Sequence, residues 1–157
     1  MSVEFKRILY PTDFSDVALC ALGHAVGLAN MFGSQLYCIH VLEDAYQYWS
    51  ALGPESIPCG PPPEEMLETA RKRMDLFRQE HFGELKSELI TDVVMGRSFA
   101  EIIVYAKEKD IDLIVMATHG RGAVAQMLLG STVEKVVRKA PCAVLTVRAD
   151  GHEFSTS

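Results

Sequence analysis

The sequence predicts an α/β domain: a parallel sheet covered by helices on both faces. Apolar segments of strand length alternate along the chain with segments of helical periodicity, which is the pattern of repeated strand–helix–strand units. Residues 113–117 are all apolar, as expected of a strand that is buried on both faces. At 157 residues, the chain has the length of one domain that can bury a substantial core.

The expected strands span residues 7–11, 35–41, 88–94, 113–117 and 142–148. Each lies between turn or cap residues. The first helix is expected to begin after Ser15, an N-cap residue, and to end near residue 32, where Gly33 follows. The next helix is expected over 63–82, because apolar residues recur there at helical spacing before Gly83.

Two more helices are expected from serine–glutamate pairs. Ser98 is followed by Glu101, and Ser131 by Glu134, which is the spacing of a capping box. The pattern predicts helices over 98–109 and 131–139 with a serine cap at the start of each.

Composition excludes several classes of protein. The chain is 48% hydrophobic and 23% charged, and its net charge of −6 comes with no block of lysine or arginine, which argues against a nucleic-acid partner. No apolar run approaches the roughly 18 residues of a membrane span, so no membrane partner is expected. Residues 1–5 lack the apolar segment of a signal peptide, and a cytoplasmic location is expected.

The cysteines show no metal-binding or disulfide pattern. Cys20, Cys38 and Cys142 lie in apolar stretches, where a free thiol behaves as a small hydrophobic side chain, whereas Cys59 lies in a Pro/Gly-rich segment and is expected to be exposed. Free thiols suit a reducing compartment. No histidine stands at ligand spacing from a cysteine or another histidine, so no metal site made by the protein alone is expected.

The segment from residue 113 to 131 has the pattern of an anion site. A buried strand leads into a loop containing Gly120 and Gly130, and Ser131 then opens a helix, whose N-terminal N–H groups favour negative charge. It is not a Walker loop, because no lysine precedes Ser131, and it lacks the third glycine of the dinucleotide motif.

The spacing resembles the ATP-binding signature of the universal stress protein family. That signature is Gly-x-x-Gly, then nine residues, then a glycine followed by serine or threonine. Gly120, residues 121–129 and Gly130-Ser131 match, while Ala117 stands at the first glycine. Other blocks resemble the family in the same order: residues 6–15, His40-Val41, Gly96-Arg97-Ser98 with Ile102, and residues 141–147.

The resemblance implies a Rossmann-like sheet of the adenine nucleotide alpha hydrolase type, with strand order 3-2-1-4-5. It implies a universal stress protein domain over residues 1–150, a flexible tail over 151–157, and a homodimer that pairs through strand 142–148. This strand is expected at the edge of the sheet, where an exposed apolar strand favours pairing with another chain. Residues 43–62, which hold Tyr46, Tyr48 and Trp49, are expected to be a long family-variable loop rather than a lid or a dimer contact.

The resemblance also implies ATP or AMP as ligand, with Mg²⁺ reached through Asp13. Asp13 is otherwise a turn residue that bonds nearby N–H groups, and Val41 would offer its backbone to adenine. Arg121 and His119 could contact phosphate or remain ordinary loop side chains. The candidate nucleotide-binding residues are Pro11, Thr12, Asp13, Val41, Met116, Ala117, His119, Gly120, Arg121, Gly130, Ser131, Thr132 and Val133.

The expected function is a dimeric nucleotide-dependent switch in a stress response, with an unidentified downstream protein partner. No catalytic set is evident, so the chain is not expected to be an enzyme beyond slow, incidental ATP hydrolysis. An alternative is a dimeric interaction module of the same fold that binds no nucleotide, which Ala117 favours. A phospho-receiver domain is disfavoured, because Asp13 follows Pro11-Thr12 rather than another acid.

Overall fold

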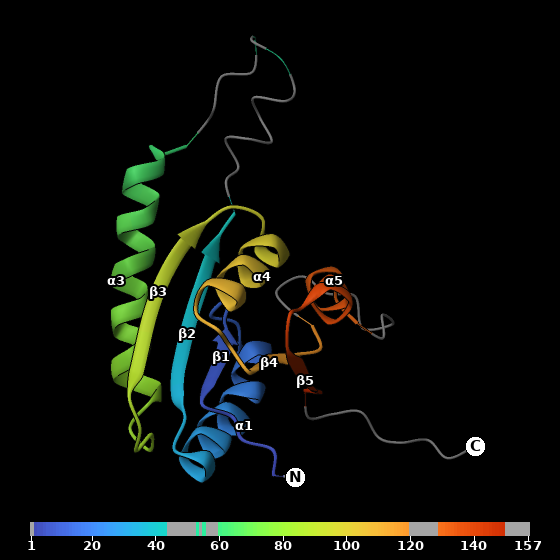
Figure 1. Cartoon of the computed structure of the whole chain (residues 1–157). Helices are drawn as coiled ribbons and strands as arrows, with labels where there is room; N and C mark the ends of the chain where they lie inside the picture. Colours follow the sequence, from blue (N-terminus) through green and yellow to red (C-terminus); the bar gives the residue numbers. More distant parts are fainter. Residues whose placement is uncertain (1, 44–52, 54, 56–59, 120–128, 150–157) are drawn as a thin grey trace, which may run out of the picture.

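The computed structural model describes residues 2–43, 53, 55, 60–119 and 129–149. Its strands are β1 (Arg7–Pro11), β2 (Gln35–Leu42), β3 (Leu89–Met95), β4 (Leu113–Ala117) and β5 (Ala143–Val147). Its helices are α1 (Asp16–Phe32), α3 (Pro63–His81), α4 (Ser98–Glu108) and α5 (Ser131–Lys139). All neighbouring strands are parallel, and their order is β3-β2-β1-β4-β5, as expected (Figure 1).

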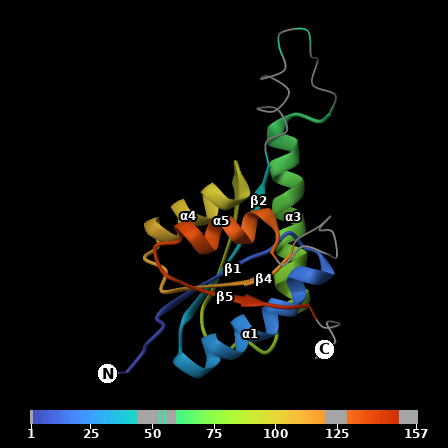
Figure 2. The same ribbon diagram turned by 90° about the vertical axis from the view of Figure 1, so that its right-hand side faces the viewer.

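The helices cover the sheet on both faces, so the chain has three layers (Figures 1 and 2). Successive strand residues point to opposite faces. Ile8 and Tyr10 therefore pack in the cluster beneath α1 and α3, while Leu9 packs in the cluster beneath α4 and α5. Every residue of β4 is buried, which confirms the two-sided burial expected from its apolar sequence.

The first helix is capped as the sequence predicts. The Ser15 hydroxyl accepts a hydrogen bond from the Ala18 N–H at 3.1 Å. At the other end Gly33 has a left-handed φ of 65°, and its N–H donates to the Ala29 carbonyl. Glycine adopts this conformation without the steric cost that a Cβ would bring.

The expected capping box at Ser98 and Glu101 is wrong. The Glu101 N–H donates to the Arg97 carbonyl at 3.0 Å, a bond of the helix itself, so α4 begins one residue earlier than a Ser98 cap would require. The Ser98 hydroxyl turns away from the helix and donates to Glu43 Oε1 at 2.8 Å. A contact between distant segments has replaced the local one.

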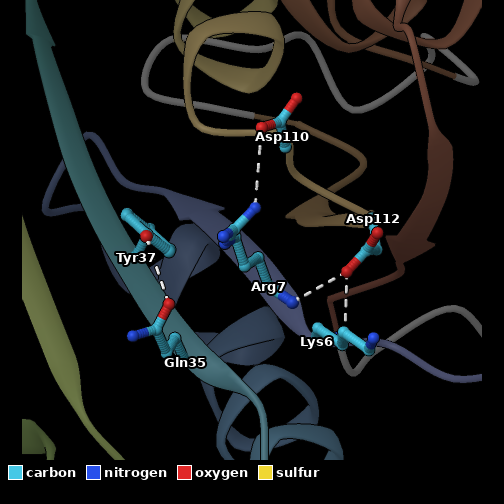
Figure 3. A network of polar contacts seen from close by, with 6 residues as sticks. All are labelled: Lys6, Arg7, Gln35, Tyr37, Asp110 and Asp112. Carbon is cyan, nitrogen blue, oxygen red and sulfur yellow. Dashed lines mark hydrogen bonds and ion pairs between the residues drawn. The ribbon is translucent and has the colours of Figure 1, made fainter.

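Polar contacts fix the amino ends of the central strands. Asp112, just before β4, accepts hydrogen bonds from the backbone N–H groups of Lys6 and Arg7 at 2.8 and 2.9 Å (Figure 3). The Arg7 guanidinium also lies 3.6 Å from the Asp110 carboxylate. These contacts hold β1 beside β4, and the carboxyl ends of the two strands are thereby placed together.

The described cysteines Cys20, Cys38 and Cys142 are free thiols, and Cys59 lies outside the described residues. Burial raises the pKa of the Cys38 and Cys142 thiols, which therefore stay protonated and poorly nucleophilic at neutral pH. None of the helices in the described part of the chain combines the length and apolar character needed to cross a bilayer.

Candidate functional site

The described candidate residues lie together at the carboxyl edge of the sheet. Thr12 and Asp13 follow β1, Val41 lies near the end of β2, and residues 117–119 end β4 and follow it. The strand order sets β1 between β2 and β4, so these strand ends are neighbours. Gly120 and Arg121 lie outside the described residues. Open parallel sheets bind ligands at such an edge, beyond the strand ends.

A tight turn joins β1 to α1. The Phe14 N–H donates to Thr12 Oγ1 at 3.0 Å, and the Ser15 N–H donates to Asp13 Oδ1 at 2.9 Å. The Ser15 hydroxyl donates to the same carboxylate oxygen. Phe14 takes a left-handed φ of 62°. The turn role of Asp13 is therefore realised, and its carboxylate is held at the sheet edge by these bonds.

The backbone of Val41 faces a gap in the hydrogen-bond ladder. Thr12 N–H donates to the Ile39 carbonyl at 2.8 Å, which shows that the odd-numbered residues of β2 face β1. Leu42 faces the other neighbour, since its carbonyl accepts from Gly96 N–H. β1 has ended by the level of Val41, and no described residue bonds the Val41 N–H on that side.

His40 explains why the ladder stops there. Its ring Nδ1 lies 2.8 Å from the Thr12 carbonyl, and Nδ1 must donate because a carbonyl only accepts. This carbonyl is the group that the Val41 N–H would have bonded if the pairing of β1 with β2 continued. The ring also stacks on Phe14, with centroids 4.4 Å apart. Sequence reasoning missed this role; its signal is the alternation of β2, which sends His40 to the opposite face from Val41.

The ends of the segment between β4 and α5 are joined by backbone bonds. Thr118 N–H donates to the Val147 carbonyl at 2.9 Å, and Gly130 N–H donates to the Thr118 carbonyl at 2.7 Å. These bonds bring the start of α5 back to the end of β4. The Thr118 hydroxyl lies 3.0 Å from His119 Nδ1.

The expected cap at Ser131 is wrong, although the helix starts where the sequence places it. Gly130 is the N-cap residue and Ser131 is the first helical residue, because Glu134 N–H already donates to the Gly130 carbonyl at 3.0 Å. No side chain of the described residues caps α5. Within the described residues, no acceptor meets the N–H groups of Ser131, Thr132 and Val133, which is the arrangement of an anion-binding helix start.

The Ala117 methyl group packs inward. Ala117 is 6% exposed and belongs to the core cluster beneath α1 and α3. The methyl that replaces the glycine of the family signature is therefore accommodated by the core. Met116 and Val133 are also buried, in the core cluster on the other face of the sheet. Pro11 is the last residue of β1. The side chains of Met116 and Val133 therefore pack in the core below the carboxyl edge.

The arrangement can bind a polar ligand through backbone groups. It offers N–H groups at α5 and at Val41 that no described residue pairs, with a carboxylate between them at Asp13. Among the described residues, no group of three His, Cys, Asp or Glu side chains lies close enough together to hold a metal ion.

Comparison with known proteins gives the relatives of this fold. The model of the universal stress protein family matches residues 4–148. Universal stress protein MJ0531 of Methanocaldococcus jannaschii is 32% identical over 151 residues, 92% of this chain and 82% of that protein. The structure of universal stress protein UspA from Lactobacillus plantarum matches with a TM-score of 0.75 at 28% identity, covering 94% of this chain and 100% of that one.

Two more distant structures contain adenine nucleotides. A universal stress protein in complex with cAMP matches with a TM-score of 0.62 at 20% identity, over 93% of this chain and 98% of that one. The Archaeoglobus fulgidus protein in complex with dAMP matches with a TM-score of 0.60 at 19% identity, over 92% and 98%. At such identities the likeness shows the shared Rossmann-like fold alone. The match over residues 4–148 and the relative at 32% identity establish that this chain belongs to the universal stress protein family.

Proposed function

We propose that this chain binds an adenine nucleotide, ATP or AMP, at the carboxyl edge of its sheet and acts in the cytoplasm as a dimeric, nucleotide-dependent switch in a stress response. The observation that carries the proposal is a pair of backbone regions, on either side of the end of β1, whose N–H groups no described residue pairs. One is Val41 in β2, and the other is the start of α5, which follows β4.

Val41 would hold the adenine ring. Its N–H and C=O both face the gap beyond β1, and together they offer a donor beside an acceptor. The edge of adenine offers the complementary pair, a ring nitrogen that accepts and an amino group that donates. A side chain of another type at position 41 would leave this recognition intact, because the backbone supplies it.

The start of α5 would hold the phosphates. The N–H groups of Ser131, Thr132 and Val133 are unpaired among the described residues, and the helix dipole favours negative charge there. β2 and β4 are separated by β1 alone, which sets them roughly 10 Å apart at the usual strand spacing. This separation suits a ligand with a base at one end and phosphates at the other.

Asp13 would serve Mg²⁺ that arrives with the nucleotide. It follows β1, between the two regions, and carboxylate and phosphate oxygens are the ligands that this ion prefers. Gly120, Arg121 and His119 would complete the phosphate contacts in the way that the family signature implies. The related structures in complex with cAMP and dAMP support an adenine nucleotide as the ligand class.

A switch follows if the bound nucleotide prefers one conformation of the chain. The ligand can shift the conformational equilibrium only by the difference between its affinities for the two states. We assign the nucleotide a regulatory role rather than that of a substrate for rapid turnover.

The direct test is denaturing extraction of the freshly purified protein, with the released small molecules identified by mass. Co-purified ATP, ADP or AMP is the expected result. Gly130→Asp should then lose the nucleotide, since aspartate caps the helix well but sets a negative charge where phosphate would lie. Gly83→Asp, at the amino edge where a Cβ meets open space, is the matched control and should retain the nucleotide.

An empty protein that also shows no thermal shift with millimolar Mg·ATP would refute the nucleotide switch. That outcome would leave the alternative function, a dimeric interaction module of the same fold. Ala117, in place of the first glycine of the signature, is the observation that favours this alternative.

A further inference from the structure

Glu43 lies at the same edge and plays no part in the site described so far. It is the first residue after β2, two residues beyond Val41, and its side chain is exposed. The Ser98 hydroxyl donates to its Oε1 at 2.8 Å. The other carboxylate oxygen has no partner among the described residues, so the group is oriented but retains capacity to accept hydrogen bonds.

A backbone hydrogen bond and a glycine turn place Ser98 beside Glu43. The Gly96 N–H donates to the Leu42 carbonyl at 3.0 Å, which joins the end of β2 to the turn before α4. Gly96 has a φ of 149°, and a Cβ there would lie 2.6 Å from the Glu101 carboxylate. Glycine is therefore needed at this turn, and the turn presents Ser98 to Glu43.

The carboxylate lies on the same face of the sheet as α5. Val41 and the start of α5 both contribute to the cluster beneath α4 and α5, and Glu43 is bonded to the first residue of α4. Glu43 therefore stands on the β2 side of the gap beyond β1, and α5 stands on the β4 side. A nucleotide spanning the two would bring its base and sugar to Glu43.

We propose that Glu43 recognises the ribose of the bound nucleotide by accepting hydrogen bonds from its hydroxyl groups. This inference rests on the nucleotide site proposed above. It adds a specificity-determining residue, with Ser98 as the residue that positions it. The chain would thereby distinguish ribonucleotides from 2′-deoxyribonucleotides.

Charge and stereochemistry favour the ribose over other parts of the ligand. A carboxylate repels phosphates, which α5 attracts at the far side of the gap. The adenine edge is matched by the Val41 backbone. The adjacent 2′- and 3′-hydroxyls remain, and they are donors that a carboxylate accepts with charge-assisted strength. Dinucleotide-binding Rossmann folds use an acidic side chain for the ribose 2′-hydroxyl in the same chemical way.

The test is calorimetric titration of the full chain, freed of any co-purified nucleotide, with Mg·ATP and with Mg·2′-deoxy-ATP. The wild type should bind ATP at least about tenfold more tightly, the usual range for a hydrogen bond to a charged group. Glu43→Ala should bind both ligands with nearly the affinity that the wild type shows for 2′-deoxy-ATP. Ser98→Ala should reduce the preference without abolishing it, because the carboxylate remains but is no longer oriented.

Glu84→Ala is the matched control, since it removes an exposed glutamate at the amino edge and should keep the full preference. Equal affinities of the wild type for the two nucleotides would overturn the role of Glu43 while leaving the nucleotide site intact. An equal loss of affinity for both ligands in Glu43→Ala would also overturn it, by showing a structural role. Absence of any binding by the wild type would instead refute the nucleotide site, and the ribose contact with it.

Discussion

Ser15 and Ser131 each stand where a serine is expected to cap a helix, yet only Ser15 does so. The Ser15 hydroxyl accepts from the Ala18 N–H and donates to the Asp13 carboxylate. Ser131 is already helical, and Gly130 holds the cap position without a side-chain bond. The two hydroxyls therefore differ in what they contribute to stability.

Ser15→Ala is expected to lower the free energy of unfolding by about 1 kcal/mol, because it leaves the start of α1 without its cap. Ser131→Ala is expected to change it by less than about 0.5 kcal/mol, as for an exposed residue without a specific contact. Urea unfolding of both variants at one protein concentration measures the difference. Equal losses from the two substitutions would contradict this account of the two helix starts.

These residues show that the sequence predicts where a helix begins but not which partner a polar side chain bonds. The capping-box spacing locates the beginning of each helix to within one residue, but it does not decide whether the hydroxyl bonds locally. Ser98 bonds Glu43, a residue far away in the sequence, and His40 bonds the Thr12 carbonyl. The hydrogen-bond partner of such a side chain depends on which strands are neighbours in the sheet, and the order of the strands along the chain does not determine this.

The strands β4 and β5 differ in how deeply their side chains are buried. All residues of β4 are buried, whereas the residues of β5 alternate between exposed and less exposed positions until Val147. The apolar sequence of β4 is sufficient to predict a central strand. The strand order follows from the family resemblance alone, because hydrophobic periodicity is the same for any order of parallel strands.

Ile114→Ala is expected to lower the free energy of unfolding by about 2–5 kcal/mol. Ile114 is fully buried in β4, and the truncation leaves a cavity that the packed sheet and helices fill only in part. Val104→Ala removes fewer atoms from α4 at a position that is 45% exposed, and it should change stability by no more than about 0.5 kcal/mol. Chemical unfolding compares the two. A small effect of Ile114→Ala would contradict the central position of β4.

The sheet ends in β5, an edge strand with apolar side chains. Its outer edge has no neighbouring strand in the described chain, and Leu145 is 36% exposed. An uncovered edge of this kind favours pairing with another chain. The family resemblance implies that the partner is a second copy, paired through residues 142–148.

Leu145→Asp is therefore expected to convert a dimer into a monomer, because it sets two like charges near each other across a two-fold strand pair and removes apolar contact. Sedimentation velocity at several protein concentrations gives the oligomeric state. Leu76→Asp is the control: Leu76 is 58% exposed on α3, away from β5, and its substitution should leave the dimer intact. A wild type that stays monomeric, or a Leu145→Asp variant that stays dimeric, would show that β5 is not the interface.

If the dimer forms through β5, the Thr118–Val147 bond would link the interface directly to the segment that begins the nucleotide site, and this gives a physical route by which a bound nucleotide could influence assembly.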